Sequence, residues 1–191
     1  LITLMVGRKV EYTKKAVTVS EKREPILEVK NFSKQGNFKD ISLQLHKGEI
    51  LGITGLVGSG RTELAQAIFG LNKPESGTLI IDGQKVTIRS SYDAVKKGLA
   101  YIPEERQTQG LILSQSITNN ISLPILKKFR NALGLLKRKE EKKLAAESVE
   151  KLDIRPSLPD MAAEQLSGGN QQKVVISKWL ATNPKILIVD E

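Results

Sequence analysis

Residues 166–173 read Leu-Ser-Gly-Gly-Asn-Gln-Gln-Lys, and the fold that we expect for the whole 191-residue chain follows from them. Ser167 is placed to cap a helix that begins at the two glycines after it and ends before the Asn-Pro pair at 183–184. A serine hydroxyl, two glycines and a bare helix N-terminus make a surface that binds anions. The side chains predicted on the apolar face of this helix are Val175, Ile176, Trp179 and Leu180.

A second glycine-rich stretch has the spacing of the phosphate-binding loop GxxxxGK[ST], except that Arg61 stands where lysine is expected. Glycines let successive backbone N–H groups face phosphate oxygens, the next helix points its positive end at the same anion, and Thr62 can ligate Mg²⁺. A guanidinium keeps the charge of lysine but not its compact shape. Taken alone, the stretch also fits a strand-to-helix turn that binds nothing. The candidate nucleotide-binding residues are Gly55, Leu56, Val57, Gly58, Ser59, Gly60, Arg61 and Thr62.

Residues 185–191, Lys-Ile-Leu-Ile-Val-Asp-Glu, predict a buried strand that is followed by two carboxylates. The carboxyl edge of a sheet is where α/β folds place ligand chemistry. We expect Asp190 to hold Mg²⁺, directly or through water, together with Thr62. Glu191 is the candidate catalytic residue, a general base that polarises the attacking water.

The rest of the pattern predicts a layered α/β domain. Alternation at 26–29 and 41–45 is typical of half-buried antiparallel strands, whereas the continuous apolar run 50–54 predicts a strand buried on both faces. Further strands are expected at 77–83, 85–89 and 99–102, the first two joined by an Asp-Gly turn.

Helices are expected at 62–69, from a Ser90 or Ser91 cap to Lys97, and over most of 116–165. The clearest of them covers 137–152. Its charged run 137–143 predicts a solvated face. The candidates for its buried face are Leu136, Leu144, Val149 and Leu152.

The composition narrows the function classes. With no cysteine, the chain cannot be a disulfide scaffold or a thiolate enzyme. A net charge of +9 suggests nucleic acid or a membrane surface as a partner, but Lys and Arg spread over solvated faces explain the charge more simply. With only 4% aromatic residues, the chain is poorly suited to stack on the bases of single-stranded nucleic acid. No run reaches the ~20 apolar residues of a membrane span, and residues 1–6 are too short for a signal-peptide core.

The motifs together resemble the ABC transporter ATP-binding family. The octet at 166–173 resembles the ABC signature in the form carried by monosaccharide importers of the ribose, galactose and xylose type. Residues 55–64 resemble the degenerate phosphate loop of the second nucleotide-binding domain in those tandem proteins, and residues 101–111 look like the Q-loop, with Glu104 where most family members have glutamine. Residues 1–8 look like the closing segment of a first domain, so the resemblance covers the whole chain.

This resemblance implies a P-loop NTPase fold with an antiparallel β subdomain, a RecA-like parallel core and a helical subdomain, cut at the Walker B strand. It also implies an end of a preceding domain at 1–8, a linker at 9–24 and the second nucleotide-binding domain at 25–191. ATP and Mg²⁺ are the expected cofactors. The residues that would complete the ATP site of the other domain are Leu166, Ser167, Gly168, Gly169, Asn170 and Gln171.

The implied partners are an upstream nucleotide-binding domain in the same chain, transmembrane permease subunits and, indirectly, a periplasmic or extracellular sugar-binding protein, at the cytoplasmic face of the membrane. No nucleic acid is expected. Glu104 and residues 111–124 are the candidates for the permease contact. The family's switch histidine would follow residue 191, so we expect this chain alone not to hydrolyse ATP. Its single histidine, His46, is expected at the surface.

Several alternatives stay open. Phe32 and Phe38 are candidates to stack on adenine, and either could equally belong to the core. The motor could serve nucleosides or a sugar-derived signal. An ABC-type ATPase acting on nucleic acid or ribosomes is a rival, although no long heptad run lies between Glu63 and Gln165. A regulatory module that binds nucleotide without hydrolysing it is the third, because Arg61 replaces the phosphate-loop lysine.

Overall fold

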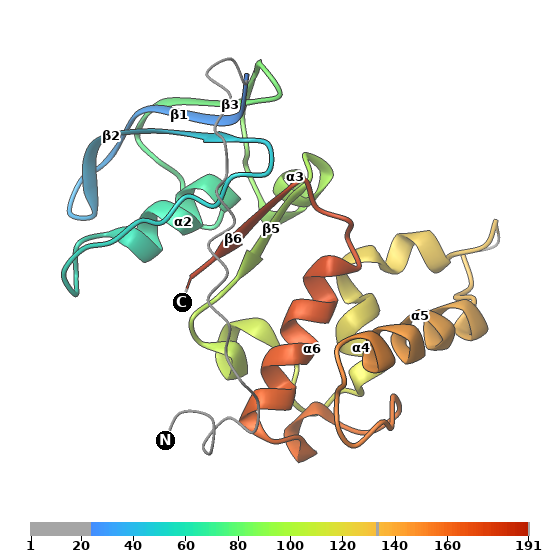
Figure 1. The fold of residues 1–191 in the computed structure, drawn as a ribbon. Coiled ribbons are helices and arrows are strands. Elements are labelled where there is room, and N and C mark those ends of the chain that lie inside the picture. Colours follow the sequence, from blue (N-terminus) through green and yellow to red (C-terminus); the bar gives the residue numbers. More distant parts are fainter. Residues whose placement is uncertain (1–23, 133, 191) are drawn as a thin grey trace.

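The computed structural model describes residues 24–132 and 134–190, and its first layer is an antiparallel sheet (Figure 1). The sheet has the order β2-β1-β3-β4, and its strands are β1 (Pro25–Lys34), β2 (Phe38–His46), β3 (Ser76–Ile81) and β4 (Gln84–Val86). Leu27 pairs with Ile81 and Val29 with Leu79, so the alternating apolar side chains of neighbouring strands share the buried face. The antiparallel strands predicted from alternation are confirmed.

The predicted Asp-Gly turn joins β3 to β4. Asp82 and Gly83 both have positive φ angles, 49° and 72°, which is the backbone that a two-residue hairpin requires. The second strand is shorter than expected, since β4 ends at Val86 rather than Arg89.

A parallel pair forms the second layer, between β5 (Leu99–Ile102) and β6 (Ile186–Val189). All four residues of β5 are buried, as expected for a strand covered on both faces. Two helices pack nearby: α2 (Arg61–Phe69), and α3 (Ser91–Lys96), which Ser90 caps by accepting a hydrogen bond from the Asp93 backbone N–H. The core between these elements contains an aromatic cluster of Phe69, Tyr101 and Trp179.

The strand predicted at 50–54 is not present. These residues have no regular structure, and Ile50 is 98% exposed. An apolar run forms a strand only when a neighbouring strand accepts its backbone hydrogen bonds, and no described strand pairs with this segment. The prediction of a buried strand at 50–54 is therefore wrong for this structure, because the composition of the run cannot show whether a neighbouring strand is present.

The helical part of the chain forms a separate cluster. It contains a short π-helical turn η1 (Arg106–Gly110), α4 (Ile117–Ser122), the 3₁₀ helix η2 (Leu123–Phe129), α5 (Arg138–Lys151), η3 (Ala163–Gln165) and α6 (Gly168–Leu180). Ile117, Ile121, Ile154 and Val174 are fully buried at its centre. Figure 1 shows this part beside the parallel strands, with α6 running between the two regions.

Two predictions about helix faces are confirmed only in part, since Val149 of α5 and Val175 of α6 are buried as expected. The charged run 137–143 is not wholly solvated, because Glu141 is 1% exposed. The buried stripe of α5 consists of Glu141, Ala145 and Val149. The predicted residues Leu136, Leu144 and Leu152 are only partly buried. On α6, Leu180 is 43% exposed, while Ser177 and Lys178 are buried. The boundaries of these helices were predicted well, but their rotation is set by tertiary packing.

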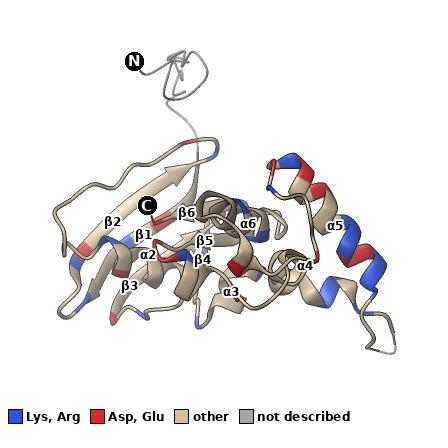
Figure 2. Ribbon diagram, turned by 90° about the horizontal axis from the view of Figure 1, so that it is seen from below, with Lys and Arg blue, Asp and Glu red and all other residues tan. Residues whose placement is uncertain are grey.

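The charges are dispersed. Figure 2 shows Lys and Arg distributed over several elements, with acidic residues between them on α5. None of the helices formed by the described residues combines the length and apolarity that crossing a bilayer requires. The proposed preceding-domain segment 1–8 and nearly all of the linker 9–24 lie outside the described residues.

Candidate nucleotide site

The glycine-rich loop ends at Gly60, which the backbone requires to be glycine. Gly60 has φ +83° and caps α2, and a Cβ at this position would lie 2.3 Å from the carbonyl oxygen of Asn37. Within the loop, the Ser59 N–H donates to the Leu56 carbonyl at 3.0 Å, and Leu56 and Val57 are 85% and 100% exposed. The loop therefore presents an open backbone at the N-terminus of a helix, which is the environment that attracts phosphate.

The two predicted metal ligands lie in contact. The Thr62 hydroxyl donates to Asp190 Oδ1 at 3.1 Å, although 128 residues separate them in sequence. The Asp190 backbone N–H donates to the Ile102 carbonyl at 2.9 Å, which extends the β5–β6 pairing by one residue and fixes the aspartate at the strand end. The fold thus brings the start of α2 and the end of β6 to one point.

Tyr101 completes this cluster and was not predicted as a site residue. Its hydroxyl donates to Asp190 Oδ2 at 2.7 Å. Burial, followed by the hydrogen bond to Asp190, raises the pKa of the Tyr101 phenol above its ordinary value, so the group stays a donor. Gln66, one turn along α2 from Thr62, contacts the same hydroxyl, and the charge of Glu104 acts on it as well. The only sequence signal for this role was Tyr101 itself, a polar aromatic residue within the strand expected at 99–102.

These residues fit a nucleotide with its magnesium ion. No group of three or more His, Asp or Glu side chains among the described residues could hold a metal alone, so a cation at Thr62 and Asp190 needs phosphate oxygens as further ligands. Mg²⁺ supplies charge neutralisation on those phosphates. Arg61, the first residue of α2, is exposed beside the loop. The candidate base Glu191 lies outside the described residues.

The two candidate adenine residues are core residues in this structure. Phe32 is 3% and Phe38 is 9% exposed, and both belong to the cluster beneath the antiparallel sheet. Phe38 also lines a cavity of about 400 Å³ that reaches Ser59 and Arg61. His46 lies at the surface as expected, with Nδ1 2.9 Å from Glu49 Oε2.

The signature segment is anchored at both ends and open in the middle. Leu166 and Gln171 are buried, and the Gln171 side chain donates to the Ala163 carbonyl. Ser167 takes the N-cap position, but its hydroxyl accepts from the Asn170 amide at 3.0 Å instead of capping a helix N–H. The first backbone N–H groups of α6 are therefore not satisfied by this serine, and Gly169 is exposed with open space around its Cα.

The structure does not bring the phosphate loop and the signature together. The helices α2 and α6 meet at their C-terminal ends, where the rings of Phe69 and Trp179 lie 5.4 Å apart, edge to face. Gly168 lies 11 residues before Trp179, roughly 16 Å along the helix, and Figure 1 shows the two N-terminal ends in different parts of the molecule. The phosphate loop and the signature segment are therefore two candidate half-sites that lie in different parts of the molecule.

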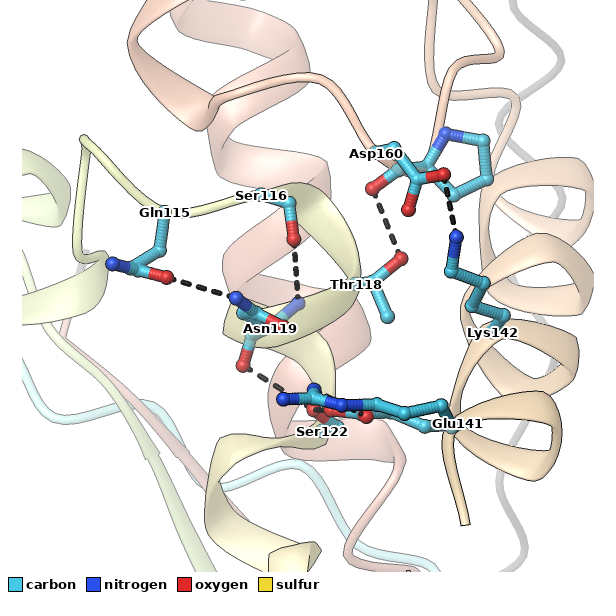
Figure 3. Close-up of polar contacts among 10 residues, drawn as sticks. Gln115, Ser116, Thr118, Asn119, Ser122, Glu141, Lys142 and Asp160 are labelled. Atoms are coloured by element: carbon cyan, nitrogen blue, oxygen red, sulfur yellow. Dashed lines mark hydrogen bonds and ion pairs between the residues drawn. The ribbon is translucent and has the colours of Figure 1, made fainter. Parts of the chain in front are cut away.

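Residues of the candidate permease stretch 111–124 line a hollow, together with the buried Glu141 of α5. Figure 3 shows the polar contacts of Glu141 and Ser122. Glu141 accepts from the Ser122 hydroxyl at 2.5 Å and from Arg138 Nη1 at 2.9 Å. The hollow has a volume of about 280 Å³, and Ile112 and Leu123 at its edge are 46% and 47% exposed. Apolar side chains thus surround a polar floor on the surface of the helical part.

The chain is similar to a large set of known proteins. The family described as "ABC transporter" matches residues 38–191. A ribose import ATP-binding protein, RbsA 1, of Agrobacterium fabrum is 48% identical over 193 residues, and RbsA of Bacillus subtilis is 42% identical over 193 residues. Both alignments include the whole chain, which spans only 37% and 38% of the length of these curated relatives.

Solved structures agree with the architecture. A dimeric ATP-binding cassette, MJ0796, bound to ADP and Pi superposes with a TM-score of 0.70 at 27% identity, covering 86% of this chain and 73% of that chain. A nucleotide-free ATP-binding cassette also gives a TM-score of 0.70, at 26% identity, covering 88% and 69% of the two chains. The expected fold, an α/β P-loop NTPase of the ATP-binding-cassette type, is confirmed.

Proposed function

The chain belongs to the ABC transporter family, and from this premise we propose that it is the second nucleotide-binding domain of the ATP-driven motor of a monosaccharide importer. The observation that carries the proposal is the contact between Thr62 and Asp190 at the end of the phosphate loop. A hydroxyl and a carboxylate from distant motifs meet there, and such oxygen ligands suit the Mg²⁺ of MgATP.

The separation of the two half-sites supports a paired mechanism. We propose that the phosphate loop, Thr62 and Asp190 hold one MgATP, with Glu191 as the base for the attacking water. The signature, Ser167 to Gln171, would complete the site built on the loop of another nucleotide-binding domain. Asp190 is oriented by its two hydroxyl partners, so the side chain keeps one geometry as nucleotide enters.

The permease is proposed to contact Glu104 and residues 111–124 at the cytoplasmic face of the membrane. The exposed Ile112 and Leu123 beside the hollow offer apolar contact area, and Asn119 and Arg138 offer hydrogen-bond donors at its edge. Such a mixture of apolar and polar groups suits a protein segment as partner.

A monosaccharide is proposed as cargo because the relatives that span this chain are ribose import proteins. A motor for nucleosides or a sugar-derived signal is the alternative. No observation favours a nucleic-acid partner, since the basic residues are dispersed among acidic ones (Figure 2).

The test uses the complete protein reconstituted with its permease. Glu191→Gln should abolish both ATP hydrolysis driven by this site and sugar uptake into vesicles, while nucleotide binding remains. Unchanged transport would instead support a regulatory, non-hydrolysing role. ATPase stimulation by DNA or ribosomes, and not by the permease, would contradict the proposal.

A further inference from the structure

The segment that follows β5 connects the two half-sites. The residues just before this segment contact Asp190 of the candidate nucleotide site. The Ile102 carbonyl accepts from the Asp190 N–H, and the Tyr101 hydroxyl donates to the Asp190 carboxylate. Residues 103–105 then lead directly into the turn η1. Figure 1 shows this turn beside α6, the helix that carries the signature.

Contacts between η1 and α6 continue along the helix. The Gln107 amide donates to Gln171 Oε1 at 3.2 Å, and Lys178 Nζ donates to the Gly110 carbonyl. A Cβ on Gly110 would lie 3.0 Å from the Val175 side chain, so the backbone of the turn lies directly on the helix. Any movement of η1 is therefore passed to α6.

Arg106 makes the contact nearest the signature. Its Nη2 atom lies where a Cβ on Gly168 would be only 2.6 Å away, so glycine at 168 is needed to admit the guanidinium. The Nε donor of Arg106 is buried and has no hydrogen-bond partner among residues 24–132 and 134–190. A buried donor without an acceptor costs free energy, so an arrangement in which Arg106 Nε gains an acceptor is favoured over this one.

We propose that Arg106, assisted by Gln107, is a positioning residue that couples the chain's own nucleotide site to its signature helix. Occupation of the Thr62–Asp190 site acts on the end of β5, and Arg106 passes that change to Gly168, where the nucleotide of the paired domain is completed. The inference rests on the proposed function, because it assumes a second domain that uses this signature.

The experiment is a double-mutant cycle in the complete protein with its permease. Thr62→Ala weakens the chain's own site, and Arg106→Gln removes the guanidinium from Gly168. Steady-state ATP hydrolysis is measured for the parent, each single variant and the double variant. The matched control is Arg89→Gln, an exposed arginine whose side chain forms no hydrogen bond with the described residues.

We expect Arg106→Gln to lower the rate at saturating ATP by about fivefold or more, with the KM for ATP changed by less than about twofold. In the Thr62→Ala background the same substitution should change the rate by less than about twofold, because the signal that Arg106 transmits is already lost. Arg89→Gln should leave the rate unchanged in both backgrounds.

Two outcomes would overturn the inference: a parent-like rate for Arg106→Gln, or the same loss in both backgrounds, which is the result of a purely structural role. If Arg106→Gln does not fold, as judged by circular dichroism, Gln107→Ala takes its place, since that side chain is exposed. The fall in the rate of ATP hydrolysis caused by Gln107→Ala should again be smaller when Thr62 is replaced. An equal fall in both backgrounds contradicts the proposal. Absence of ATP hydrolysis in the parent would refute the proposed function itself.

Discussion

Asp190 is held by two hydroxyl groups that come from different layers of the fold. Thr62 contacts one carboxylate oxygen and Tyr101 the other. A hydrogen bond to a charged acceptor contributes more than one between neutral groups. The tyrosine therefore orients the aspartate, and under the proposed function the threonine exchanges its contact for a shared metal ion.

Replacing Tyr101 with phenylalanine should lower the unfolding free energy by about 2 kcal/mol, because a charged acceptor loses a partly buried donor. Urea unfolding measures the change. Tyr92→Phe is the matched control, since the Tyr92 hydroxyl bonds Lys127 Nζ at an exposed site. An equal loss of unfolding free energy in both variants would show that the contact with Asp190 stabilises the fold no more than an exposed hydrogen bond does.

Lys178 is a buried cation on α6, 8% exposed, with the Trp179 ring 5.1 Å from its Nζ. Burial lowers the pKa of its ammonium group from 10.5 to about 8. Between pH 8 and 10.5 the unfolded chain holds a proton here that the folded chain has lost. The unfolding free energy must therefore rise with pH in that interval.

Lys178→Met should remove this rise. Between pH 8 and 10.5 the unfolding free energy of the parent, measured with urea, should rise by up to about 3 kcal/mol more than that of the variant. Lys151→Met, at an exposed lysine of α5, should leave the slope of the parent unchanged. A parallel pair of profiles for the parent and Lys178→Met would contradict the assignment.

Among the elements, α5 shows how a charged residue can belong to a core. Glu141 lies in line with Ala145 and Val149 on the buried stripe, and Ser122 of α4 meets its carboxylate. The ion pair with Arg138 reaches the surface, where the arginine side chain is 62% exposed. This carboxylate therefore joins two helices that otherwise meet through apolar side chains.

Glu141→Ala should cost about 2 kcal/mol of unfolding free energy, because the buried Ser122 hydroxyl loses the carboxylate and keeps only the longer contact with the Asn119 carbonyl at 3.4 Å. The neighbouring Glu140→Ala is the control, as Glu140 pairs with Lys137 at the surface and should change stability by less than about 0.5 kcal/mol. Chemical unfolding of both variants decides the point, and equal effects would mean that Glu141 does not join the helices.

The sequence predicted elements where local chemistry determines them. The Asp-Gly hairpin, the Ser90 cap and the helix after Ser167 follow from residues adjacent in the chain, and all three are confirmed. The strand at 50–54 and the burial of Glu141 depend on partners far away in sequence, so composition alone could not predict them.

The same division holds for the site. Glycine spacing predicted the loop before α2, and the structure brings Thr62 into contact with Asp190, while their role as metal ligands stays a prediction. The roles of Tyr101 and Arg106 were not predicted, because each acts through a residue about 60 to 90 positions away in the chain, as the contacts to Asp190 and Gly168 show. The wrong prediction at Leu180 has the same origin, since packing sets the rotation of α6.

At the scale of the whole molecule, the separated half-sites predict the behaviour of the chain by itself. Purified alone, the 191-residue chain should show no measurable ATP turnover, because its own signature cannot reach its own phosphate loop. A phosphate-release assay with the chain at low concentration checks this. Turnover that Glu191→Gln abolishes would contradict the prediction.

The separate positions of the phosphate loop and the signature segment also restrict how two such units can join. A surface that offers a loop on one side and a signature on the other can pair head to tail only in two ways. Either a two-fold or pseudo-two-fold axis closes the pair with both contacts used, or each contact recruits a further unit and the assembly grows into a larger ring or a filament. Placing two units in one polypeptide raises their effective concentration for each other and selects the closed pair. On this argument, the edge-to-face contact of Phe69 and Trp179 is a determinant of symmetry, since it sets the directions in which both surfaces point.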